Sequence, residues 1–580
     1  MDKQTIGAVV GFCALAFAVV GGSLYLQSTQ PVDSDGLELD AEPLADDQRP
    51  NVIIILWDTT RADRLSLYGY DLETTPRMRA WAEKGVIFEN AVSPAMWTVP
   101  SHASMFTGLP PTTHGAGQDY RWLDHSNVTL AEHFRDNGYD TYAFSANPNL
   151  TTTGKNLLQG FETVNVSWGG RWRKKVDENT RAKQIERDAA TEISPSFPKK
   201  GTGHKPFTYN AGPVTQEAFG GWLLKQRDES KPFLAYLSYM ESHKPRIPTL
   251  ESRQKVADQD VVELALQTDI SFEKQLAYSY DQISYTDKEL EAINRTYDAC
   301  LIDLDNATGD LLDQLEQRGY LENTIVIFTS DHGEMLGEHQ LFGHRASVFE
   351  ELLHVPLVIS WPGHIDAERV AEPVSNLDIY NTLIELAGVP RPEQKMSMGN
   401  LVRDAKRAAG AFAEMMSVDN VGWKNVVALY PDLDRGPWTV KYRSFRHGDH
   451  KLIRDSNGVE RLFHLGEDPG EHSDLSASSP DLLTLLQGKL DAYLATVDAY
   501  DPAKRTKRDL QAKGASEDSM TKEKCEMMRD LGYIEGDCDE LPSEADKPSG
   551  DRAKGEKAKN PRRQRVKGGK GKAKGQKRRK

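Results

Sequence analysis

Short runs of consecutive apolar residues, rich in β-branched and aromatic side chains, recur along the first 360 positions. The clearest run is NVIIIL at 51–56, and others occupy 141–145, 233–239, 324–329 and 355–360. Runs of this length without polar alternation are typical of strands that are buried on both faces. We therefore expect these segments to form the centre of a sheet.

Segments with helical periodicity lie between these runs, at 76–84, 127–136, 214–226 and 290–318. Strands that alternate with helices of this length predict an α/β fold, in which helices cover both faces of a mostly parallel sheet. Ligands of such sheets bind at the carboxyl ends of the strands. Polar residues that follow the apolar runs are thus candidates for chemistry, and they are Asp58, His243, Asp331 and His332.

The pattern changes after about residue 400. Segments 440–446, 451–454 and 460–465 have the composition of short antiparallel strands, and an Asn-Gly pair between the last two is a hairpin-turn sequence. An amphipathic helix is expected at 480–497. These features predict a smaller α+β subdomain behind the large sheet.

The chain opens with an apolar segment, 6–26, whose 21 residues carry no charge and are numerous enough to cross a bilayer. Lys3 precedes this segment, and seven acids and one arginine follow it at 27–50. Because the basic side tends to stay cytoplasmic, we expect the rest of the chain outside the membrane, in the periplasm or at the cell surface. Two interpretations stay open, a signal anchor and a signal peptide with a cleavage site at AFA, 16–18.

The net charge of −16 conceals an uneven distribution. Residues 551–580 hold 15 Lys and Arg against 2 Asp and Glu, so this tail carries +13 and the rest of the chain −29. An acidic body argues against specific nucleic-acid binding by the folded part. The tail is expected to be disordered, either as a solvated extension or as a segment that binds anionic polymers outside the membrane.

Cysteine is rare in this chain, with residues at Cys13, Cys300, Cys525 and Cys538. These positions show neither zinc-finger spacing nor a dense disulfide framework. Cys525 and Cys538 would pair in an oxidising compartment, but the interpretation we favour is two free thiols.

Hydrolysis of a tetrahedral anionic ester needs a nucleophile, a cation against the ester charge and donors around its oxygens. Asp58 and Asp331 each follow a buried strand, where a lone carboxylate is costly without a cation or a partner. A single aspartate at such a position is equally well explained as a helix N-cap. Two of them, with His332 beside the second, indicate a metal site.

Five segments in order along the chain resemble the sulfatase family of the alkaline phosphatase superfamily. They are NVIIILWDTTRADRLSLYGY at 51–70, TVPSHASMFTG at 98–108, DHGEMLGEHQLFGH at 331–344, VSNLDIYNTLIELAGVP at 374–390 and the stretch 442–475, which ends in FHLGEDPGEHSDL. The resemblance implies the alkaline phosphatase/sulfatase-like fold and a metal-dependent hydrolase of ester bonds.

The resemblance also implies the metal ligands. Asp58 matches the first metal-binding Asp of the family, Asp331 and His332 match a later pair, and Thr98 supplies a further oxygen. Thr59 replaces a second Asp that binds metal in many sulfatases, so the site has one carboxylate fewer. Oxygen donors favour calcium, magnesium or manganese, while the imidazole admits zinc. Two-zinc relatives carry Asp-x-x-x-His, but a tyrosine replaces that Asp here, so we expect one divalent ion.

Three histidines complete the implied catalytic set. His102 takes the place of the Arg in the Cys-x-Pro-Ser-Arg motif, and His243, in ESHKPR, matches a His that holds the substrate or leaving group. His344, in LFGHR, stands where many sulfatases have a Lys that contacts the anion. We expect these histidines to neutralise ester oxygens or to protonate the leaving group, without assigning each role.

Thr98 departs from the family in its chemistry, because it stands where sulfatases have the Cys or Ser that becomes formylglycine. Formylglycine is an aldehyde made from a primary thiol or alcohol, whereas a threonine would give a ketone, so no formylglycine is expected. A sulfated threonine would need water to attack sulfur, while a phosphothreonine is released by metal-assisted attack. We therefore expect Thr98 to attack the ester and phosphoesters to be preferred.

Two alternatives remain. One is a true sulfuric ester hydrolase in which water attacks directly and Thr98 is only a ligand. The other is a non-catalytic, membrane-tethered binding protein on a decayed hydrolase fold, against which the intact ligand set argues. The expected substrate is a small-molecule, glycan or lipid-headgroup ester, and the Arg- and Lys-rich stretch 165–210 is interpreted as a variable insertion that contributes to its pocket.

The expected organisation has five parts. They are a membrane anchor or signal segment at 1–27, an acidic linker at 28–50, a catalytic domain at 51–400, an antiparallel-sheet subdomain at 401–500 and a polar tail at 501–580, with a possible helix at 522–531 and a basic, disordered end from about 545.

Overall fold

The structure is a computed structural model of the 580-residue chain. It describes residues 49–151, 155–188, 211–407, 410–416, 427–428, 430–433 and 438–518, with scattered positions from 520 to 541. The predicted anchor or signal segment, nearly all of the acidic linker, part of the 165–210 stretch, most of the 522–531 helix and the basic tail lie outside these residues. Within the described ranges, no helix has both the length and the apolar composition that crossing a bilayer requires.

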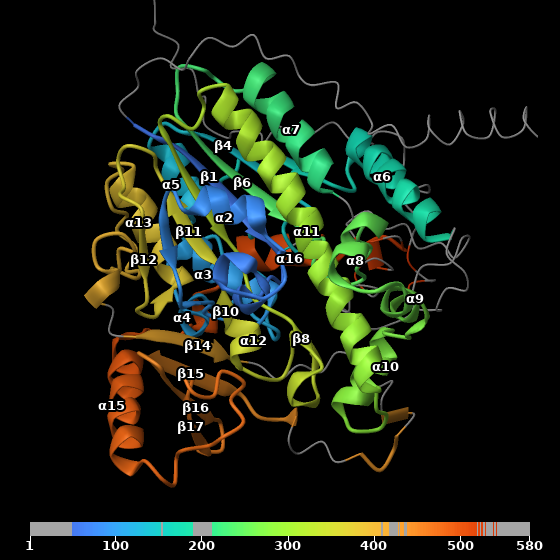
Figure 1. The fold of residues 1–580 in the computed structure, drawn as a ribbon. Helices are drawn as coiled ribbons and strands as arrows, with labels where there is room; N and C mark the ends of the chain where they lie inside the picture. Colours follow the sequence, from blue (N-terminus) through green and yellow to red (C-terminus); the bar gives the residue numbers. More distant parts are fainter. Residues whose placement is uncertain are drawn as a thin grey trace, which may run out of the picture.

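An eight-stranded sheet forms the centre of the molecule, with the order β12-β2-β11-β7-β1-β6-β4-β5 (Figure 1). The strands are β1 (Asn51–Trp57), β2 (Val86–Phe88), β4 (Asp140–Ser145), β5 (Thr163–Val166), β6 (Phe233–Tyr239), β7 (Thr324–Thr329), β11 (Leu357–Ser360) and β12 (Glu368–Val370). The strands from β7 to β5 in this order are parallel to their neighbours. The apolar runs at 51–56, 141–145, 233–239 and 324–329 are thus confirmed as its central strands.

Helices cover both faces of the sheet, as the alternating pattern predicts (Figure 1). The even-numbered side chains from Val52 to Leu56 pack in one core with α3, α5 and α13, and the odd-numbered ones from Ile53 to Trp57 pack in a second core with α2, α7 and α11. The helices of seven or more residues before residue 400 are α2 (Pro76–Ala82), α3 (Thr98–Thr107), α5 (Leu130–Asp136), α6 (Gly170–Asp188), α7 (Gly212–Lys225), α8 (Leu250–Val256), α9 (Gln259–Gln267), α10 (Phe272–Ser279), α11 (Asp287–Gln317) and α13 (Ile379–Leu386), and α16 (Lys507–Asp518) lies near the C-terminal end of the described residues.

The fifth apolar run, 355–360, departs from the parallel order. It contains the end of the short strand β10 (His354–Val355) and then β11, which is antiparallel to both β7 and β2. A parallel neighbour requires a crossover that carries the chain back along a face of the sheet. The segment between β7 and β11 contains only short elements, the longest being α12 (Glu350–Leu353), so the chain returns in the opposite direction.

The predicted α+β subdomain is present. Its antiparallel sheet has the order β14-β15-β16-β17, and α15 packs on it (Figure 1). The elements are β14 (Ala411–Met415), β15 (Tyr442–His447), β16 (His450–Asp455), β17 (Glu460–His464) and α15 (Pro480–Thr496). The Asn-Gly pair lies in the turn between β16 and β17, where Gly458 has φ +85°.

Buried charges join the subdomain to the large sheet. Glu350, in α12, pairs with Arg446 at 2.6 Å and with Lys451 at 2.8 Å, and Lys451 also pairs with Glu471 at 3.0 Å. Because a buried charge without a partner is costly, these contacts fix the position of β15 and β16 against the catalytic part.

A disulfide joins Cys525 to Cys538, so the favoured interpretation of two free thiols is wrong. The 13-residue separation brings their Cα atoms to 5.8 Å, within the range that a disulfide spans. Cys300 lies buried in α11.

Candidate active site

Neighbouring strand ends bring the predicted residues together. β1 lies between β6 and β7, so Asp58 after β1, His243 after β6 and Asp331 after β7 share one edge of the sheet. Helix α3 begins at Thr98 on the same side. The four side chains are almost completely buried, since none exposes more than 1% of its surface.

Asp58, Asp331 and His332 form the one group among the described residues whose ligand atoms suit a metal ion, with these atoms within 4.8 Å of one another. Asp58 Oδ2 accepts a hydrogen bond from Asn147 Nδ2 at 2.6 Å. Asp331 Oδ1 accepts from the backbone N–H of His332 at 3.0 Å and of Thr59 at 3.3 Å.

The second oxygen of each carboxylate, Asp58 Oδ1 and Asp331 Oδ2, accepts no hydrogen bond within the described part of the chain. Burial and the charge of Asp331 raise the pKa of Asp58 well above its usual range, and burial also raises the pKa of Asp331. A divalent cation would reverse both effects, because it supplies opposite charge to two oxygens that lack donors. The donor set therefore fits a cation.

His332 presents the correct nitrogen to this cation site. Its Nδ1 lies 2.9 Å from the carbonyl oxygen of Gly333, which only accepts, so Nδ1 carries the proton and Nε2 the lone pair. Nε2 lies 3.3 Å from Asp331 Oδ2 and 3.4 Å from Thr98 Oγ1. Burial lowers the pKa of His332 to about 4, which keeps the imidazole in its neutral, ligand-competent form.

Thr98 occupies the first turn of α3, where the helix dipole favours negative charge. Its Oγ1 lies 3.4 Å from both His332 Nε2 and Asn147 Nδ2. The amide of Asn147 is held by the backbone N–H of Asn149, which donates to Asn147 Oδ1 at 2.9 Å. Asn147 therefore lies between the candidate nucleophile and the first metal carboxylate, Asp58.

Thr59 has a left-handed backbone, with φ +58°. A β-branched residue rarely adopts this conformation, which costs of order 1–3 kcal/mol. It directs the Thr59 N–H to Asp331 Oδ1, and Tyr297 donates to the Thr59 carbonyl at 2.8 Å. The loop after β1 thus supports Asp331 through its backbone.

His102 lies one turn along α3 from Thr98. Its Nδ1 hydrogen-bonds to the carbonyl oxygen of Thr98 at 2.9 Å, and its Nε2 lies 2.7 Å from the hydroxyl of Tyr236. Nδ1 is also 3.4 Å from Asp331 Oδ2. Burial lowers the pKa of His102, which favours the neutral ring. Both of its nitrogens contact protein groups.

His243 and His344 face each other, with ring centroids 5.2 Å apart, and His344 is 4.5 Å from His332. His243 Nδ1 donates to the carbonyl oxygen of Lys244 at 2.7 Å, and His344 Nδ1 donates to Glu334 Oε1 at 3.0 Å. Burial holds the pKa of His243 well below its usual range and lowers that of His344 to about 4. Both rings are thus fixed as neutral Nδ1–H tautomers.

Sequence reasoning missed several partners within the site, among them Asn147, Glu334 and Tyr236. Asn147 follows the apolar run at 141–145, so applying the strand-end rule to that strand as well would have found it. Glu334 orients His344 through one carboxylate oxygen. The other oxygen of Glu334 pairs with Arg246 at 2.7 Å. Burial favours protonation of Glu334, but His344 and Arg246 outweigh it and keep its pKa low. No periodicity or spacing distinguishes Glu334 from other acids.

The sequence matches the sulfatase family over residues 50–389 and the C-terminal region of N-sulphoglucosamine sulphohydrolase over 337–494. An ulvan-active sulfatase of Formosa agariphila is 28% identical, over 77% of this chain and 80% of that protein. Arylsulfatase K of Bos taurus is 26% identical, over 77% and 82%. A solved phosphonate monoester hydrolase of Agrobacterium radiobacter has a similar fold, with a TM-score of 0.59 and 23% identity over 77% of this chain and 96% of that one.

These matches include every part of the chain that builds the site. Asp58, Thr98 and Asp331 all lie within 50–389, and the C-terminal sheet lies within 337–494. The eight-stranded sheet, its helical layers and the smaller sheet have the arrangement of the similar solved structure. The chain is therefore an ester-hydrolysing enzyme of the sulfatase family, in the alkaline phosphatase superfamily.

Proposed function

We propose that the chain hydrolyses phosphate- or sulfate-type esters with the Thr98 hydroxyl as nucleophile, and that phosphoesters are its preferred substrates. The position of Thr98 Oγ1 carries this proposal, since it lies 3.4 Å from His332 Nε2 and shares Asn147 with Asp58. A secondary alcohol has no route to an aldehyde, so release of the covalent group relies on attack at phosphorus or sulfur. That step is easier at phosphorus with a cation present.

The residues that would hold the cation are Asp58, Asp331, His332 and Thr98. When bound, a divalent ion supplies Lewis-acid neutralisation of the ester oxygens. The oxygen-rich set favours one calcium, magnesium or manganese ion, and the imidazole admits zinc.

His243 and His344 are proposed to contact the ester and the leaving oxygen. Their Nδ1 atoms donate to the Lys244 carbonyl and to Glu334, and we propose Nε2 as the atom that exchanges a proton with substrate. Both rings are neutral in the free protein, and an anionic ester raises their pKa by stabilising the imidazolium. The protonated form then donates to the leaving alkoxide.

For His102 the contacts support a positioning role. Its two nitrogens contact the Thr98 carbonyl and the Tyr236 hydroxyl, so it holds the first turn of α3, where Thr98 lies. Fixing the nucleophile in this way lowers the entropy cost of the attack. Direct contact between His102 and the ester stays a prediction.

A true sulfuric ester hydrolase is the second candidate function. The observation that favours it is the description of the curated relatives, which are an ulvan-active sulfatase and arylsulfatase K. In this case water would attack sulfur and Thr98 would only bind the cation. Under either chemistry we propose a glycan ester as the substrate, and the description of the ulvan-active relative supports this choice.

We also propose that the catalytic part lies outside the cytoplasmic membrane. The support is the pairing of Cys525 with Cys538, because disulfides persist in oxidising compartments. The uncharged segment at 6–26 adds to it. Labelling of the tagged chain in intact cells with a membrane-impermeant reagent tests the location.

The deciding experiment compares the hydrolysis of 4-nitrophenyl phosphate, bis(4-nitrophenyl) phosphate and 4-nitrophenyl sulfate. Each substrate is assayed with calcium, magnesium, manganese and zinc. We expect kcat/KM for a phosphate monoester or diester to exceed that for the sulfate by orders of magnitude. Faster cleavage of the sulfate would select the second candidate. No turnover of any of the three by a cation-loaded, folded sample would contradict both.

A further inference from the structure

Two cationic side chains lie beside the pair of histidines that is proposed to contact the leaving oxygen. Lys244 follows His243 in the chain and Arg345 follows His344, and the two histidine rings lie 5.2 Å apart. The two cations also meet in space, because Lys244 Nζ lies 4.7 Å and Arg345 Cζ 4.9 Å from the centre of the same ring, that of Phe272. Positive charge is therefore concentrated next to these histidines.

Helix α10 packs against the segment that carries His344. The rings of Tyr278, in this helix, and of Phe342, two residues before His344, have centroids 4.9 Å apart. Lys244 Nζ donates a hydrogen bond to Gln275, also in α10, at 2.9 Å. Contacts in space, as well as the order of the chain, thus place Lys244 beside the segment of His344.

Lys244 is a buried ammonium that forms no ion pair with the described residues. It exposes 7% of its surface, and its hydrogen bond to Gln275 goes to a neutral amide. Glu334 attracts it, but the two oxygens of Glu334 bind Arg246 and His344. A buried charge without an ion pair is costly, so an anion brought by a ligand would offset this cost.

The charges around Lys244 also favour an anion at this place. Burial, and next the charge of Arg345, lower the pKa of Lys244 to about 7, and Arg246 adds to this effect while Glu334 and Glu273 oppose it. An anion near both cations offsets their repulsion and favours the protonated ammonium. Because Arg345 is only half-buried, a ligand has access to the pair from its side.

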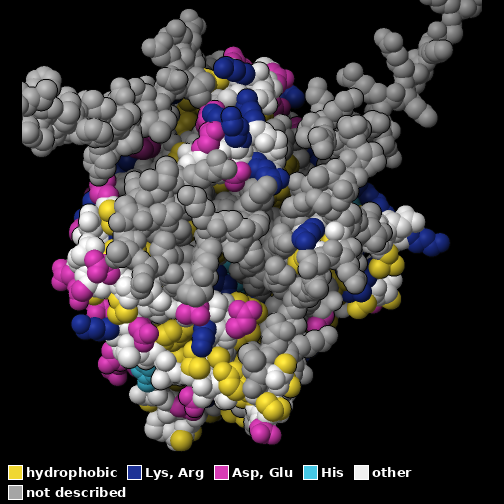
Figure 2. Space-filling model, turned by 90° about the vertical axis from the view of Figure 1, so that its right-hand side faces the viewer, with side chains coloured by type: hydrophobic (Ala, Val, Ile, Leu, Met, Phe, Trp, Pro, Cys, Tyr) yellow, Lys and Arg dark blue, Asp and Glu magenta, His cyan; other side chains and the backbone are white. Residues whose placement is uncertain are grey.

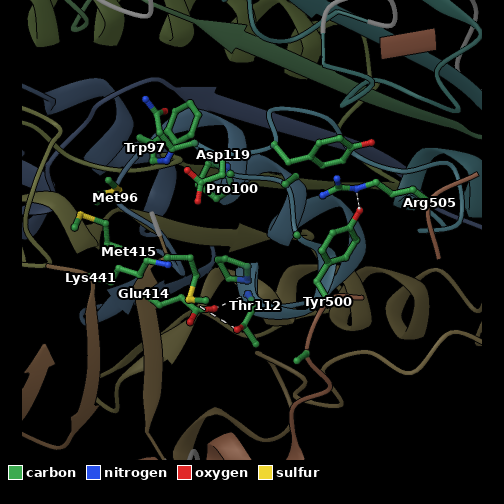
Figure 3. Close-up of a pocket in the computed structure, with 18 residues that line it drawn as sticks. Met96, Trp97, Pro100, Thr112, Asp119, Glu414, Met415, Lys441, Tyr500 and Arg505 are labelled. Carbon is green, nitrogen blue, oxygen red and sulfur yellow. Dashed lines mark hydrogen bonds between the residues drawn. The ribbon is translucent and has the colours of Figure 1, made fainter. Parts of the chain in front are cut away.

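The cavity of about 300 Å³ beside Trp97 lacks this excess of positive charge (Figure 3). Its charged lining residues are two acids and two bases, Asp119, Glu414, Lys441 and Arg505. None of the candidate nucleophile, metal ligands and histidines of the site is among the residues that line it. An anionic group on the substrate is therefore expected at Lys244 and not in this cavity.

We infer that Lys244 and Arg345 bind a second anionic group of the substrate, carried by the alcohol part of the ester. The inference rests on the proposed ester hydrolysis at Thr98. It narrows the substrate class to esters whose leaving alcohol has a negative charge of its own, such as a carboxylate. Lys244 then determines specificity for the leaving group by binding this charge, and it takes no part in breaking the ester bond.

The test compares 3-carboxyphenyl phosphate with 3-carbamoylphenyl phosphate, which are similar in shape and differ in the charge of the alcohol part. Lys244→Met removes the ammonium and keeps an unbranched side chain against Phe272. Lys255→Met is the matched control, because Lys255 is an exposed lysine of α8 that pairs with Glu251. We expect Lys244→Met to lower the carboxy-to-carbamoyl ratio of kcat/KM about tenfold, mainly through KM, and the control to leave it unchanged.

Two further measurements separate anion binding from a structural role of Lys244. The wild-type ratio should fall as pH rises from about 6 to about 9, because the free protein loses the Lys244 proton with a pKa of about 7 and a neutral amine does not attract a carboxylate. In Lys244→Met the ratio should not change with pH. The Tm of this variant should not fall, since an apolar side chain replaces a buried charge without an ion pair. A wild-type ratio that is independent of pH, or equal to that of Lys244→Met, overturns the inference.

Arg345→Gln is a second variant, at the half-buried cation of the pair, and it should lower the same ratio. If neither ester is turned over, the proposed function fails, and calorimetric Kd values of the two esters then decide the inference alone. Binding of the carboxy ester that is about tenfold tighter, and that Lys244→Met loses and Lys255→Met retains, would support it. Equal Kd values for the two esters in the wild type would reject it.

Discussion

Asp58 and Asp331 each have one oxygen held by hydrogen bonds and a second that accepts none in the described part of the chain. In Asp331→Asn the cation loses a charged ligand, while the mutual repulsion of the two carboxylates disappears. We therefore expect activity below a tenth of wild type, with no fall in the Tm of the cation-free protein. Saturating cation, at about 100 Kd, should stabilise the wild type by ~2.7 kcal/mol and the variant by far less.

The control for this variant is Asp305→Asn. Asp305 is also buried, but it accepts from the backbone N–H groups of Arg77 and Met78 at the start of α2, away from the site. Its replacement should lower Tm and preserve the cation response. Thermal unfolding with and without each cation measures both quantities. An Asp331→Asn protein that keeps the full cation response would show that the metal site lies elsewhere.

Substitutions of Thr98 separate nucleophilic attack from cation binding. Thr98→Ala removes both the attacking hydroxyl and an oxygen ligand, so we expect no turnover above background. Thr98→Ser retains a primary hydroxyl and should keep part of the phosphoester activity, within about a hundredfold of wild type. Single-turnover experiments with labelled phosphate ester should trap a covalent adduct at position 98 in the wild type. Full activity of Thr98→Ala would mean that water attacks directly.

Asn147 shows what the sequence allowed at this scale and what it did not. Its place after a predicted strand was visible, but only the structure shows that its amide contacts both Asp58 and Thr98. Glu334 and Tyr236 act through contacts with His344 and His102 that link distant parts of the chain. Such partners depend on tertiary packing, so local patterns carry no signal for them.

Asn147→Ala should therefore weaken cation affinity and kcat/KM by about 10- to 100-fold, as the loss of a group that orients a metal ligand does. The matched control is Asn165→Ala, which removes a half-buried amide in β5 that contacts Trp172 and Tyr142 instead. Cation titration followed by activity compares the two. Equal effects of both changes would reduce Asn147 to a general packing role.

At the scale of elements, long apolar runs with helices between them were predicted correctly, because burial on both faces requires an uninterrupted apolar strand. The failures are elements whose position depends on partners. β11 (LVIS) is apolar and β-branched like β7 (TIVIFT), yet it is antiparallel because its connection lacks a crossover helix. β14 is only AFAEM, and it becomes a strand by pairing with β15, about 30 residues later in the chain.

Glu414 in β14 gives the subdomain a pH-dependent contribution. Its Oε1 accepts from the Thr112 N–H at 2.5 Å, and burial raises its pKa to about 7. Between the ordinary glutamate pKa and this value, the folded state holds a proton that the unfolded chain has released. Its contribution to the free energy of unfolding therefore falls as pH rises through this window and stays low above it.

Glu414→Gln cannot titrate and keeps the acceptor for Thr112. The Tm difference between this variant and wild type should therefore shift in favour of the variant as pH rises from 5 to 8. Glu393→Gln, at an exposed position, serves as the control. A Tm difference that stays constant across the range would show that Glu414 is ionised in the folded protein throughout.

At the scale of the whole molecule, the described surface mixes both signs of charge. On the face in Figure 2, basic and acidic side chains of the described residues are interspersed. A nucleic-acid-binding domain gathers Lys and Arg on one face or stripe, and this view shows no such gathering of the described side chains.

Arg49 holds the chain at the start of β1. Arg49 donates to the carbonyl oxygen of Asn137 at 2.7 Å and lies 5.3 Å from the centre of the Tyr139 ring, and β1 starts two residues later. These contacts hold the start of β1. The site lies at the opposite, carboxyl end of β1.

Deletion of residues 1–27 should therefore give a protein that remains in the soluble fraction after expression and keeps kcat/KM within about twofold of the full chain in detergent. The matched comparison is a deletion of residues 1–50, which removes Arg49 and should lower Tm through loss of its contacts with Asn137 and Tyr139. Differential scanning calorimetry and the aryl phosphate assay measure the two effects. Loss of activity in a folded 1–27 deletion would show that the N-terminal segment takes part in the catalytic fold, and the start of the folded domain would then have to move upstream of Arg49.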